Sequence, residues 1–360
     1  MKIGKILRGG GLKSKVVNAL TSRSSAAPVV AQETVEEKTR RYIPNGRLVN
    51  NLSVNLGSAP CNHSCLFCPQ SIEKPKKAEW LDLILLDKVL DELPEENSSV
   101  FISSYSETLA APNLVDAIRL VKTKRPNLTV IMASNGSLYR EQTIRSIMEA
   151  GLDWYSYSFD AATREDYLKM VGVDHFDKVW ENLDKIVSLR NEIAPNMKIT
   201  THVMAFEGRE QAFENFKAYW DPKLDGINFR RVSNWGDDEL GILRQMAEAG
   251  FKPIQGVPKR RYPCMSIFSH LKLDHQGDYF PCQAAVPGQE VKSIGALGNA
   301  QNITVQEAWA RMSNLRQAHL RGDWESEKVC EHCTVWTLWD DVWSKSPDGG
   351  FDLLIPDYAK

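Results

Sequence analysis

The chain has 360 residues, of which 42% are hydrophobic, and its 44 Lys and Arg residues nearly balance its 46 Asp and Glu residues. This length and apolar content suffice for one large core or for two domains. The balanced charge gives no support for a nucleic acid or an acidic membrane as partner. No apolar run approaches the ~20 residues of a membrane span, and the first residues lack the apolar stretch of a secretory signal. We therefore expect a cytoplasmic protein, without a transmembrane segment, whose seven cysteines are not structural disulfides.

Residues 1–48 form a basic segment that carries no visible catalytic motif. Six Lys and Arg residues and no acidic residue occur up to Arg23, and a stretch rich in Ser, Ala and Pro follows. This composition predicts a solvated arm and linker, with one short amphipathic helix over residues 13–20. Contact with an anionic surface or partner is the alternative.

From residue 50 onward, short β-rich runs alternate with longer runs of helical periodicity. Six such β/α units in a row predict a parallel sheet, and their regular length favours a partial (β/α)6 barrel. A doubly wound sheet would give the same one-dimensional pattern, but in either fold chemistry is expected at the carboxyl ends of the strands. The expected strands lie within residues 48–58, 99–107, 127–136, 152–161, 196–207 and 225–235, and the expected helices within 79–94, 113–124, up to 151, 165–170, 174–192, 210–220 and 238–249.

The pattern changes beyond residue 260. Residues 270–281, "HLKLDHQGDYFP", predict a hairpin with "HQG" at its turn, and residues 304–320 predict one amphipathic helix that precedes "CEHC". We therefore expect a barrel domain over residues 49–250, a small cysteine-rich domain over 251–345 and a tail over 346–360.

Three cysteines, Cys61, Cys65 and Cys68, stand in the loop after the first expected strand. A zinc site would need a fourth ligand, and His63 cannot easily point the same way as the thiolates on both sides of it. Three thiolates suit a 4Fe–4S cluster that leaves one iron open for a second molecule, although an unusual zinc loop or three structural cysteines remain alternatives.

This C-x3-C-x2-C motif, with Phe67 before its last cysteine, resembles the signature of the radical S-adenosylmethionine superfamily. The resemblance implies that the open iron binds the amino and carboxylate groups of S-adenosylmethionine. It also implies that reductive cleavage gives a 5′-deoxyadenosyl radical, which abstracts a hydrogen atom from the substrate. An external electron donor such as flavodoxin or ferredoxin is implied as partner, and Phe67 is expected beside the cluster or the adenine.

The ends of the next three strands also resemble motifs by which that superfamily holds its cofactor. "SYSETL" stands where the family has Gly-Gly-Glu-Pro, with only the glutamate kept, "ASNG" resembles Thr-Asn-Gly, and "YSFDA" resembles Ser-Leu-Asp-Gly. Each is also an ordinary turn sequence, so the support comes from their order at successive strand ends. The resemblance implies cofactor contacts at Tyr105, Ser106, Glu107, Ser134, Asn135 and Ser158.

The remaining four cysteines follow the pattern C-x12-G-x4-C and then C-x2-C. This pattern resembles the auxiliary-cluster domain called SPASM, or its shorter relative called twitch, and four ligands suffice for one auxiliary 4Fe–4S cluster. A structural zinc site with four cysteine ligands is the alternative that the spacing permits. The expected ligands are Cys264, Cys282, Cys330 and Cys333.

Members of the group that this chain resembles need a hydrogen donor, usually a cysteine thiol, to invert a carbon centre. Those that oxidise a carbinol need none, since the substrate radical gives a proton to a base and an electron to the auxiliary cluster. Because the seven cysteines divide into three and four, no thiol is left over, and the resemblance therefore favours oxidation of a carbinol. The relatives that the chain resembles act on aminocyclitols and sugars, so a sugar or polyol is the first choice of small-molecule substrate. The alternatives are a sugar epimerase, an enzyme that modifies ribosomal peptides, and a non-catalytic iron–sulfur or zinc protein.

Polar side chains on the fifth and sixth strands are candidates for substrate contact. Such a substrate needs several hydrogen-bonding groups at the strand ends, and an arginine would equally suit the phosphate of a nucleotide sugar. Arg230 and Arg231 point to opposite faces of a strand, so only one can face the barrel interior. The candidates are His202, Glu207, Arg230, Arg231 and Asn234, with catalytic roles expected for Arg230, His202 and Glu207.

Overall fold

A computed structural model describes residues 51–72, 74–94, 99–236, 241–252, 261–282, 295–325 and 328–337, and the backbone of 343–345 and 351–353. The expected basic arm over residues 1–48, with its short helix, lies outside the described residues. So does the expected tail, apart from the backbone of 351–353.

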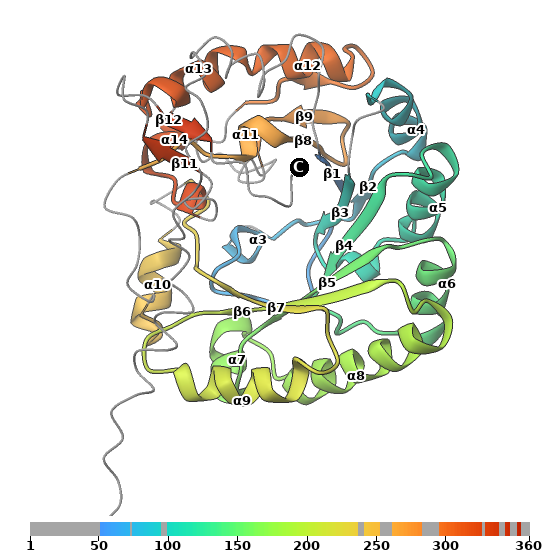
Figure 1. Ribbon diagram of the computed structural model, residues 1–360, viewed down its shortest axis with the longest axis vertical. Helices are drawn as coiled ribbons and strands as arrows, with labels where there is room; N and C mark the ends of the chain where they lie inside the picture. The colour runs from blue at the N-terminus through green and yellow to red at the C-terminus, as the bar shows by residue number, and fades with distance from the viewer. Residues whose placement is uncertain are drawn as a thin grey trace, which may run out of the picture.

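Six parallel strands form a curved sheet in which the spatial order follows the chain order (Figure 1). A doubly wound sheet would reverse direction at a switch point, and none occurs along this path. The six expected β/α units and the partial barrel are therefore confirmed. The strands are β1 (Asn51–Ser58), β3 (Ser99–Tyr105), β4 (Thr129–Ser134), β5 (Trp154–Asp160), β6 (Lys198–Met204) and β7 (Gly226–Arg230), and the short β2 (Glu79–Trp80) pairs antiparallel with β1.

Helices cover the outer, convex side of this sheet (Figure 1). Each turns an apolar face inward: Leu114, Ala117, Ile118 and Val121 of α5, spaced three and four apart, are all buried. The helices are α4 (Leu83–Glu92), α5 (Leu114–Lys124), α6 (Glu141–Glu149), α7 (Arg164–Val171), α8 (Phe176–Ile193), α9 (Glu210–Trp220) and α10 (Ile242–Glu248), with the short α3 (Pro69–Ile72) and 3-10 helix η1 (Thr108–Ala110) in the loops at the strand ends.

The strands bury both faces but with different chemistry on each. Along β5, Tyr155, Tyr157 and Phe159 enter the hydrophobic core beneath the helices, while Ser156 and Ser158 alternate with them on the inner face. Register places His202 of β6 beside Ser158. The inner face of the barrel is therefore polar at its β5–β6 side.

The expected hairpin is confirmed as β8 (His270–Leu273) and β9 (Asp278–Phe280), with Gly277 at φ +85° in its turn. β8 pairs in parallel with β1, so the C-terminal part of the chain extends the barrel sheet. The other C-terminal elements are α11 (Ser266–Ser269), β10 (Gly298–Asn299), α12 (Val305–Arg311), α13 (Ser313–Arg321), α14 (Lys328–His332), β11 (Trp343–Lys345) and β12 (Phe351–Leu353).

The expectation of a single helix over residues 304–320 is wrong, because the chain breaks at Met312 into α12 and α13. The fully buried Arg316 explains the break. Its guanidinium lies over the Trp309 ring, 3.6 Å from the centroid, and donates to the Trp309 carbonyl oxygen, which a continuous helix would use internally. Thr304 and Glu307 form a capping box that fixes the start of α12.

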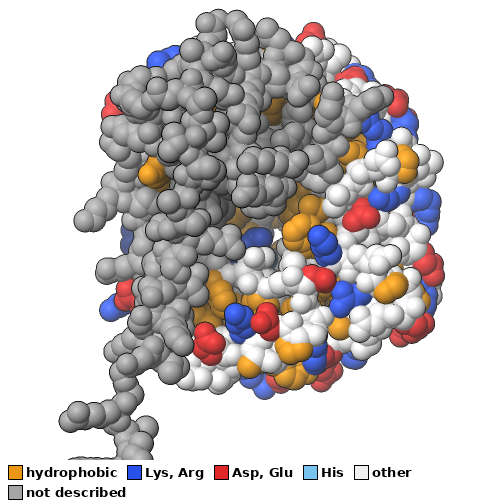
Figure 2. Space-filling model, in the orientation of Figure 1, with side chains coloured by type: hydrophobic (Ala, Val, Ile, Leu, Met, Phe, Trp, Pro, Cys, Tyr) orange, Lys and Arg blue, Asp and Glu red, His pale blue; other side chains and the backbone are white. Residues whose placement is uncertain are grey.

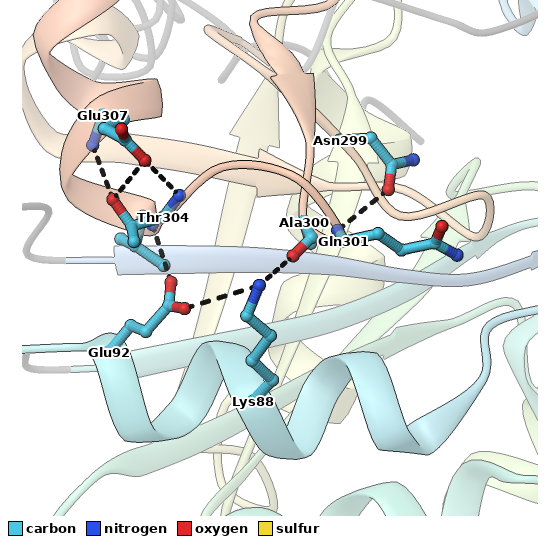
Figure 3. Close-up of polar contacts among 8 residues, drawn as sticks. Lys88, Glu92, Asn299, Ala300, Gln301, Thr304 and Glu307 are labelled. Atoms are coloured by element: carbon cyan, nitrogen blue, oxygen red, sulfur yellow. Dashed lines mark hydrogen bonds and ion pairs between the residues drawn. The ribbon is translucent and has the colours of Figure 1, made fainter.

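Polar contacts join α4 of the barrel to the segment before α12 (Figure 3). Lys88 Nζ donates to the Ala300 carbonyl oxygen at 2.5 Å, and the Val305 N–H donates to Glu92 Oε2 at 2.8 Å. Because Val305 opens α12, Glu92 supplies a negative charge at the positive end of that helix. These contacts fix the two parts of the chain against each other on the outer side.

Figure 2 shows acidic and basic side chains interspersed over the described part of the visible face. This distribution fits the net charge of -2 and gives no single-sign field over that face. No helix in the described ranges is both long enough and apolar enough to cross a bilayer.

Candidate functional site

The loop with Cys61, Cys65 and Cys68 is fixed by backbone hydrogen bonds to the end of α7. The Ser64 N–H donates to the Val171 carbonyl oxygen at 3.0 Å, and the Leu66 N–H donates to that of Met170 at 2.8 Å. These bonds hold the loop that follows β1 against the carboxyl end of α7, which lies between β5 and β6 in the chain. The barrel thus supplies backbone contacts that help to position the three-cysteine loop.

The three thiols lie close enough to influence one another's ionisation. Burial raises the pKa of all three, to about 11 for Cys68, and charge on the neighbouring thiols raises those of Cys65 and Cys68 further. Ligation requires the thiolate, and a cation bound at the loop would offset this unfavourable burial of negative charge. Three thiols that are costly to ionise alone therefore fit an iron–sulfur cluster as their partner.

Glu107, at the end of β3, is 2% exposed and accepts three hydrogen bonds. Its carboxylate receives the N–H of Asn135 at 2.8 Å, the N–H of Leu109 at 3.1 Å and the hydroxyl of Ser134. The one residue kept from the Gly-Gly-Glu-Pro motif thus holds the backbone at the ends of β3 and β4. A cofactor bound by backbone groups there would depend on Glu107 for their position, whatever side chains stand at Tyr105 and Ser106.

The other expected cofactor residues near β3 and β4 contact the cysteine loop or the neighbouring strand β8. Asn135 Nδ2 donates to Asn62 Oδ1 at 3.3 Å, and Ser106 Oγ donates to the Pro60 carbonyl oxygen at 3.5 Å. Tyr105 is buried, with Lys272 Nζ 4.6 Å from its ring centroid. The structure therefore brings the ends of β1, β3 and β4 together around the cysteine loop.

Phe67, in contrast, is held through its backbone. Its carbonyl oxygen accepts a hydrogen bond from the indole N–H of Trp235 at 2.9 Å, and its ring is partly buried against the core. Its expected place beside the cluster or adenine stays a prediction.

A second polar group occupies the inner face at the ends of β5, β6 and β7. Asp160 Oδ1 lies 3.2 Å from His202 Nε2, and both side chains are 7% exposed. A register shift between Ser158 and Asp160, together with the positive φ of 69° at Asp160, turns this carboxylate toward His202. Ser158 is the direct neighbour of His202 in the sheet, so it belongs to the same group.

Arg230 completes this group from β7. Its pKa is lowered by burial, with the charge of Asp160 acting in the opposite direction, yet its side chain is exposed to solvent. Asn228 lies two residues earlier on the same face of β7 and is also exposed. The inner face therefore offers a cation and an amide next to a buried imidazole.

The remaining predicted substrate residues do not join this group. Glu207 lies beyond β6, is exposed, and its backbone N–H donates to the Lys252 carbonyl oxygen. Asn234 Nδ2 donates to the His332 carbonyl oxygen at 2.8 Å, and Arg231 Nη1 donates to that of Thr337 at 3.4 Å. Both Asn234 and Arg231 therefore contact the C-terminal domain, and a role for them in substrate binding stays a prediction.

The four C-terminal cysteines line one pocket, together with Arg261 and His319. Burial raises the pKa of Cys264 and that of Cys333, the latter to about 12. The Cys264 N–H donates to His319 Nδ1 at 3.2 Å, which fixes that ring next to the thiol. Within the described ranges no three His, Cys, Asp or Glu side chains already converge on a single-ion position. The pocket joins all four residues predicted as auxiliary-cluster ligands.

Three residues of these sites were missed by sequence reasoning. Asp160 stands in the turn motif "YSFDA", and the signal for its pairing is that the next strand carries a histidine, His202, near the same end of the sheet. Asn228 could have been found from its alternation with Arg230. Trp235 carried no signal, because its contact with Phe67 depends on how β7 returns to the cysteine loop.

Two family profiles match this chain at these sites. Residues 58–215 match the Radical SAM superfamily, and residues 264–334 match the iron–sulfur cluster-binding domain called SPASM. The protein therefore contains a radical SAM domain followed by a SPASM domain, which implies a 4Fe–4S cluster with S-adenosylmethionine and auxiliary iron–sulfur binding.

Curated relatives of several activities match this chain at low identity. The S-adenosyl-L-methionine-dependent 2-deoxy-scyllo-inosamine dehydrogenase of Niallia circulans is 23% identical over 65% of this chain and 98% of its own. The PqqA peptide cyclase of Gluconobacter oxydans is 24% identical over 76% of this chain and 79% of its own. The GTP 3′,8-cyclase of Chlorobaculum tepidum is 25% identical over 45% of this chain, and the match spans 47% of that relative.

Solved structures share the fold. BtrN in complex with AdoMet and 2-DOIA superimposes with a TM-score of 0.53 at 16% identity, over 80% of this chain and 94% of its own. SuiB of Streptococcus suis bound to precursor peptide SuiA gives a TM-score of 0.56 at 12% identity, over 90% and 82%. At these identities the likeness establishes a common architecture.

Proposed function

We propose that the protein oxidises a carbinol of a sugar, an aminocyclitol or a related polyol to a carbonyl group. The observation that carries the proposal is the buried Asp160–His202 pair beside Arg230 on the inner face of the barrel. Support also comes from a match that spans 98% of a relative named as a dehydrogenase and 65% of this chain. The division of seven cysteines into three and four leaves no thiol donor for an epimerisation.

The pair fixes the protonation state that a proton acceptor needs. His202 Nε2 faces the Asp160 carboxylate, so Nε2 carries the hydrogen and Nδ1 keeps its lone pair. Nδ1 is buried and has no hydrogen-bond partner among the described residues. Burial and the charge of Arg230 lower the pKa of His202, which keeps the imidazole neutral near pH 7. His202 is thus the proposed base, and Asp160 stabilises the imidazolium that forms.

When bound, S-adenosylmethionine and the reduced first cluster supply hydrogen-atom abstraction, and the second cluster supplies a one-electron acceptor. The substrate carbon then loses one hydrogen atom and one electron, and the hydroxyl loses a proton. His202 Nδ1 receives that proton. Arg230 and Asn228 donate hydrogen bonds that orient the other hydroxyl groups, and Arg230 would pair with a phosphate if the substrate carries one.

In this proposal the cysteines are the cluster ligands, and the strand ends bind S-adenosylmethionine. Cys61, Cys65 and Cys68 hold the first cluster, and Glu107 positions the backbone that receives S-adenosylmethionine. The four cysteines of the C-terminal pocket hold the second cluster, and a flavodoxin or ferredoxin supplies the electron that starts each turnover.

The substitution His202→Gln tests the base. In anaerobically reconstituted enzyme with dithionite, we expect 5′-deoxyadenosine formation to persist while carbonyl product falls by about 100-fold or more, since a positioned base contributes about 10²–10⁴-fold. The matched control is His270→Asn, because His270 stands at the opposite, amino-terminal end of the parallel strands. If His202→Gln loses carbonyl product and 5′-deoxyadenosine to the same extent, while His270→Asn keeps both, His202 is not the base.

The substrate and reaction class need their own test. Incubation of sugars and polyols in D₂O separates oxidation, which places no solvent deuterium at carbon, from epimerisation, which does. A chain that binds zinc and yields no 5′-deoxyadenosine would instead be a non-catalytic metal protein.

A peptide substrate is the second candidate, favoured by the match to the PqqA peptide cyclase over 79% of its length. Carbinol oxidation predicts a product two hydrogen atoms lighter from a polyol. Modification of a peptide without turnover of any polyol would overturn the proposed substrate class while keeping the radical reaction.

A further inference from the structure

A four-residue segment after β7, Ser233–Gly236, contacts both cysteine sites. On one side the indole N–H of Trp235 donates to the carbonyl oxygen of Phe67, the residue before Cys68, at 2.9 Å. On the other side Asn234 meets the turn between Cys330 and Cys333 and the residue that follows it. The two candidate cluster loops are therefore joined through neighbouring residues of one short segment.

The contacts on the C-terminal side are dense and reciprocal. The Asn234 N–H donates to Thr334 Oγ1 at 3.0 Å, the Thr334 N–H donates to Asn234 Oδ1 at 3.0 Å, and Asn234 Nδ2 donates to the His332 carbonyl oxygen at 2.8 Å. Asn234 is 1% exposed. Such a buried amide with its groups satisfied fixes the position of the turn relative to β7.

Backbone geometry shows that the segment is fitted tightly between the two loops. Trp235 has a φ of 56°, which is a rare conformation for a bulky side chain and persists only where its surroundings over-determine it. Gly236 follows at φ 82°, and a Cβ there would lie 2.7 Å from Val329 Cγ1 and 3.8 Å from Cys333 Cβ. A side chain at position 236 would clash with Val329, so glycine allows the backbone to lie against the Cys330–Cys333 turn. The neighbouring Trp235 points its indole N–H at the three-cysteine loop.

We propose that Ser233–Gly236 is an inter-cluster tie that positions the three-cysteine loop relative to the Cys330–Cys333 turn, with Trp235 as its positioning residue. The tie makes the geometry at the first cluster depend on contacts made in the C-terminal domain. The proposal concerns placement of the two sites and is independent of the substrate.

The first test replaces Trp235 in enzyme reconstituted with both clusters. Trp235→Phe keeps a large ring but removes the N–H donor, so the loop loses one hydrogen bond. We expect the S-adenosylmethionine-dependent EPR signal of the reduced first cluster to change, and its iron to be lost to a chelator about fivefold faster, the factor that corresponds to one typical hydrogen bond. Trp235→His retains a ring N–H and tolerates positive φ, so it should restore both readouts in part.

The second test approaches the tie from the other domain. Thr334→Val removes the hydroxyl that accepts from Asn234, and we expect it too to alter the EPR signal of the first cluster, although Thr334 belongs to the C-terminal domain. The matched control is Trp220→Phe in α9, a buried tryptophan far from both loops in sequence whose Nε1 has no partner among the described residues. An unchanged first-cluster signal in both Trp235→Phe and Thr334→Val, or equal changes in Trp220→Phe, would overturn the proposal.

Discussion

Replacing Glu107 by glutamine is expected to weaken the hydrogen-bonded framework at the ends of β3 and β4. The carboxylate Oε1 accepts from Leu109 N–H and Ser134 Oγ, and Oε2 accepts from Asn135 N–H. Glutamine has a single acceptor oxygen. If its oxygen takes the Oε1 place, its NH₂ group faces the Asn135 N–H, and in the opposite orientation it faces the Leu109 N–H.

Either orientation of the introduced amide leaves one buried backbone N–H without an acceptor, at a cost of about 1–3 kcal/mol. Glu107→Ala removes the acceptor for both N–H groups and opens a cavity, so it should cost about 3–5 kcal/mol. Because these N–H groups lie at the ends of β3 and β4, Glu107→Gln should also weaken S-adenosylmethionine binding by about tenfold, the factor that about 1.4 kcal/mol represents.

Urea denaturation and calorimetric titration of S-adenosylmethionine into the reconstituted enzyme measure these effects. The matched control is Glu181→Gln, an exposed glutamate on α8 paired with Lys185, which should stay within about 0.5 kcal/mol of the parent. If Glu107→Gln binds S-adenosylmethionine as tightly as the parent and unfolds at the same urea concentration, the assignment of Glu107 to holding the strand ends is refuted.

Two further outcomes follow from local geometry and burial. Gly136 has φ +68° and a Cβ there would enter the Tyr157 ring, whereas Gly250 has φ +87° with nothing within 4 Å, so Gly136→Ala should cost about 1–3 kcal/mol more than Gly250→Ala in urea unfolding. Equal costs would show that only backbone strain matters. Burial lowers the pKa of His270 from 6.5 to about 4, so the unfolded chain binds its proton first as the pH falls. The contribution of His270 to the free energy of unfolding should be fully present above pH 6.5 and be lost, by about 3 kcal/mol, as the pH falls toward 4. His270→Asn should reduce that loss in denaturation curves taken across this range. An unaltered pH dependence in the variant would contradict a buried neutral imidazole.

The strands and helices of the barrel were predictable because each depends on a local pattern. Leu52, Val54 and Leu56 alternate along β1 and all enter the core, and the apolar positions of α5 repeat at helical spacing. The order of the strands was not predictable, since the same pattern serves a doubly wound sheet. The break at Met312 was missed because it depends on Arg316, whose guanidinium takes a carbonyl oxygen one helix away.

The candidate site divides in the same way. The cysteines that spacing assigns to one cluster lie in one loop or line one pocket, and the charge of Arg230 acts on His202. The ligand and catalytic roles of these residues stay predictions. Asn234 is one of the polar candidates near the sixth strand, and its amide donates to the Cys330–Cys333 turn. Which of two polar residues faces a cavity and which binds a neighbouring domain depends on tertiary contacts that spacing does not encode.

The parallel pairing of β8 with β1 has a consequence for how the chain is made. Asn51 pairs with His270 and Val54 with Leu273, so one edge of β1 stays open until the C-terminal hairpin has left the ribosome. An open edge with Leu52, Val54 and Leu56 beside it invites pairing with another chain. Truncation before residue 264 would make that edge permanent. Strand β8 therefore protects an edge of the barrel sheet, and an exchange of the C-terminal domain between relatives should carry β8 with it.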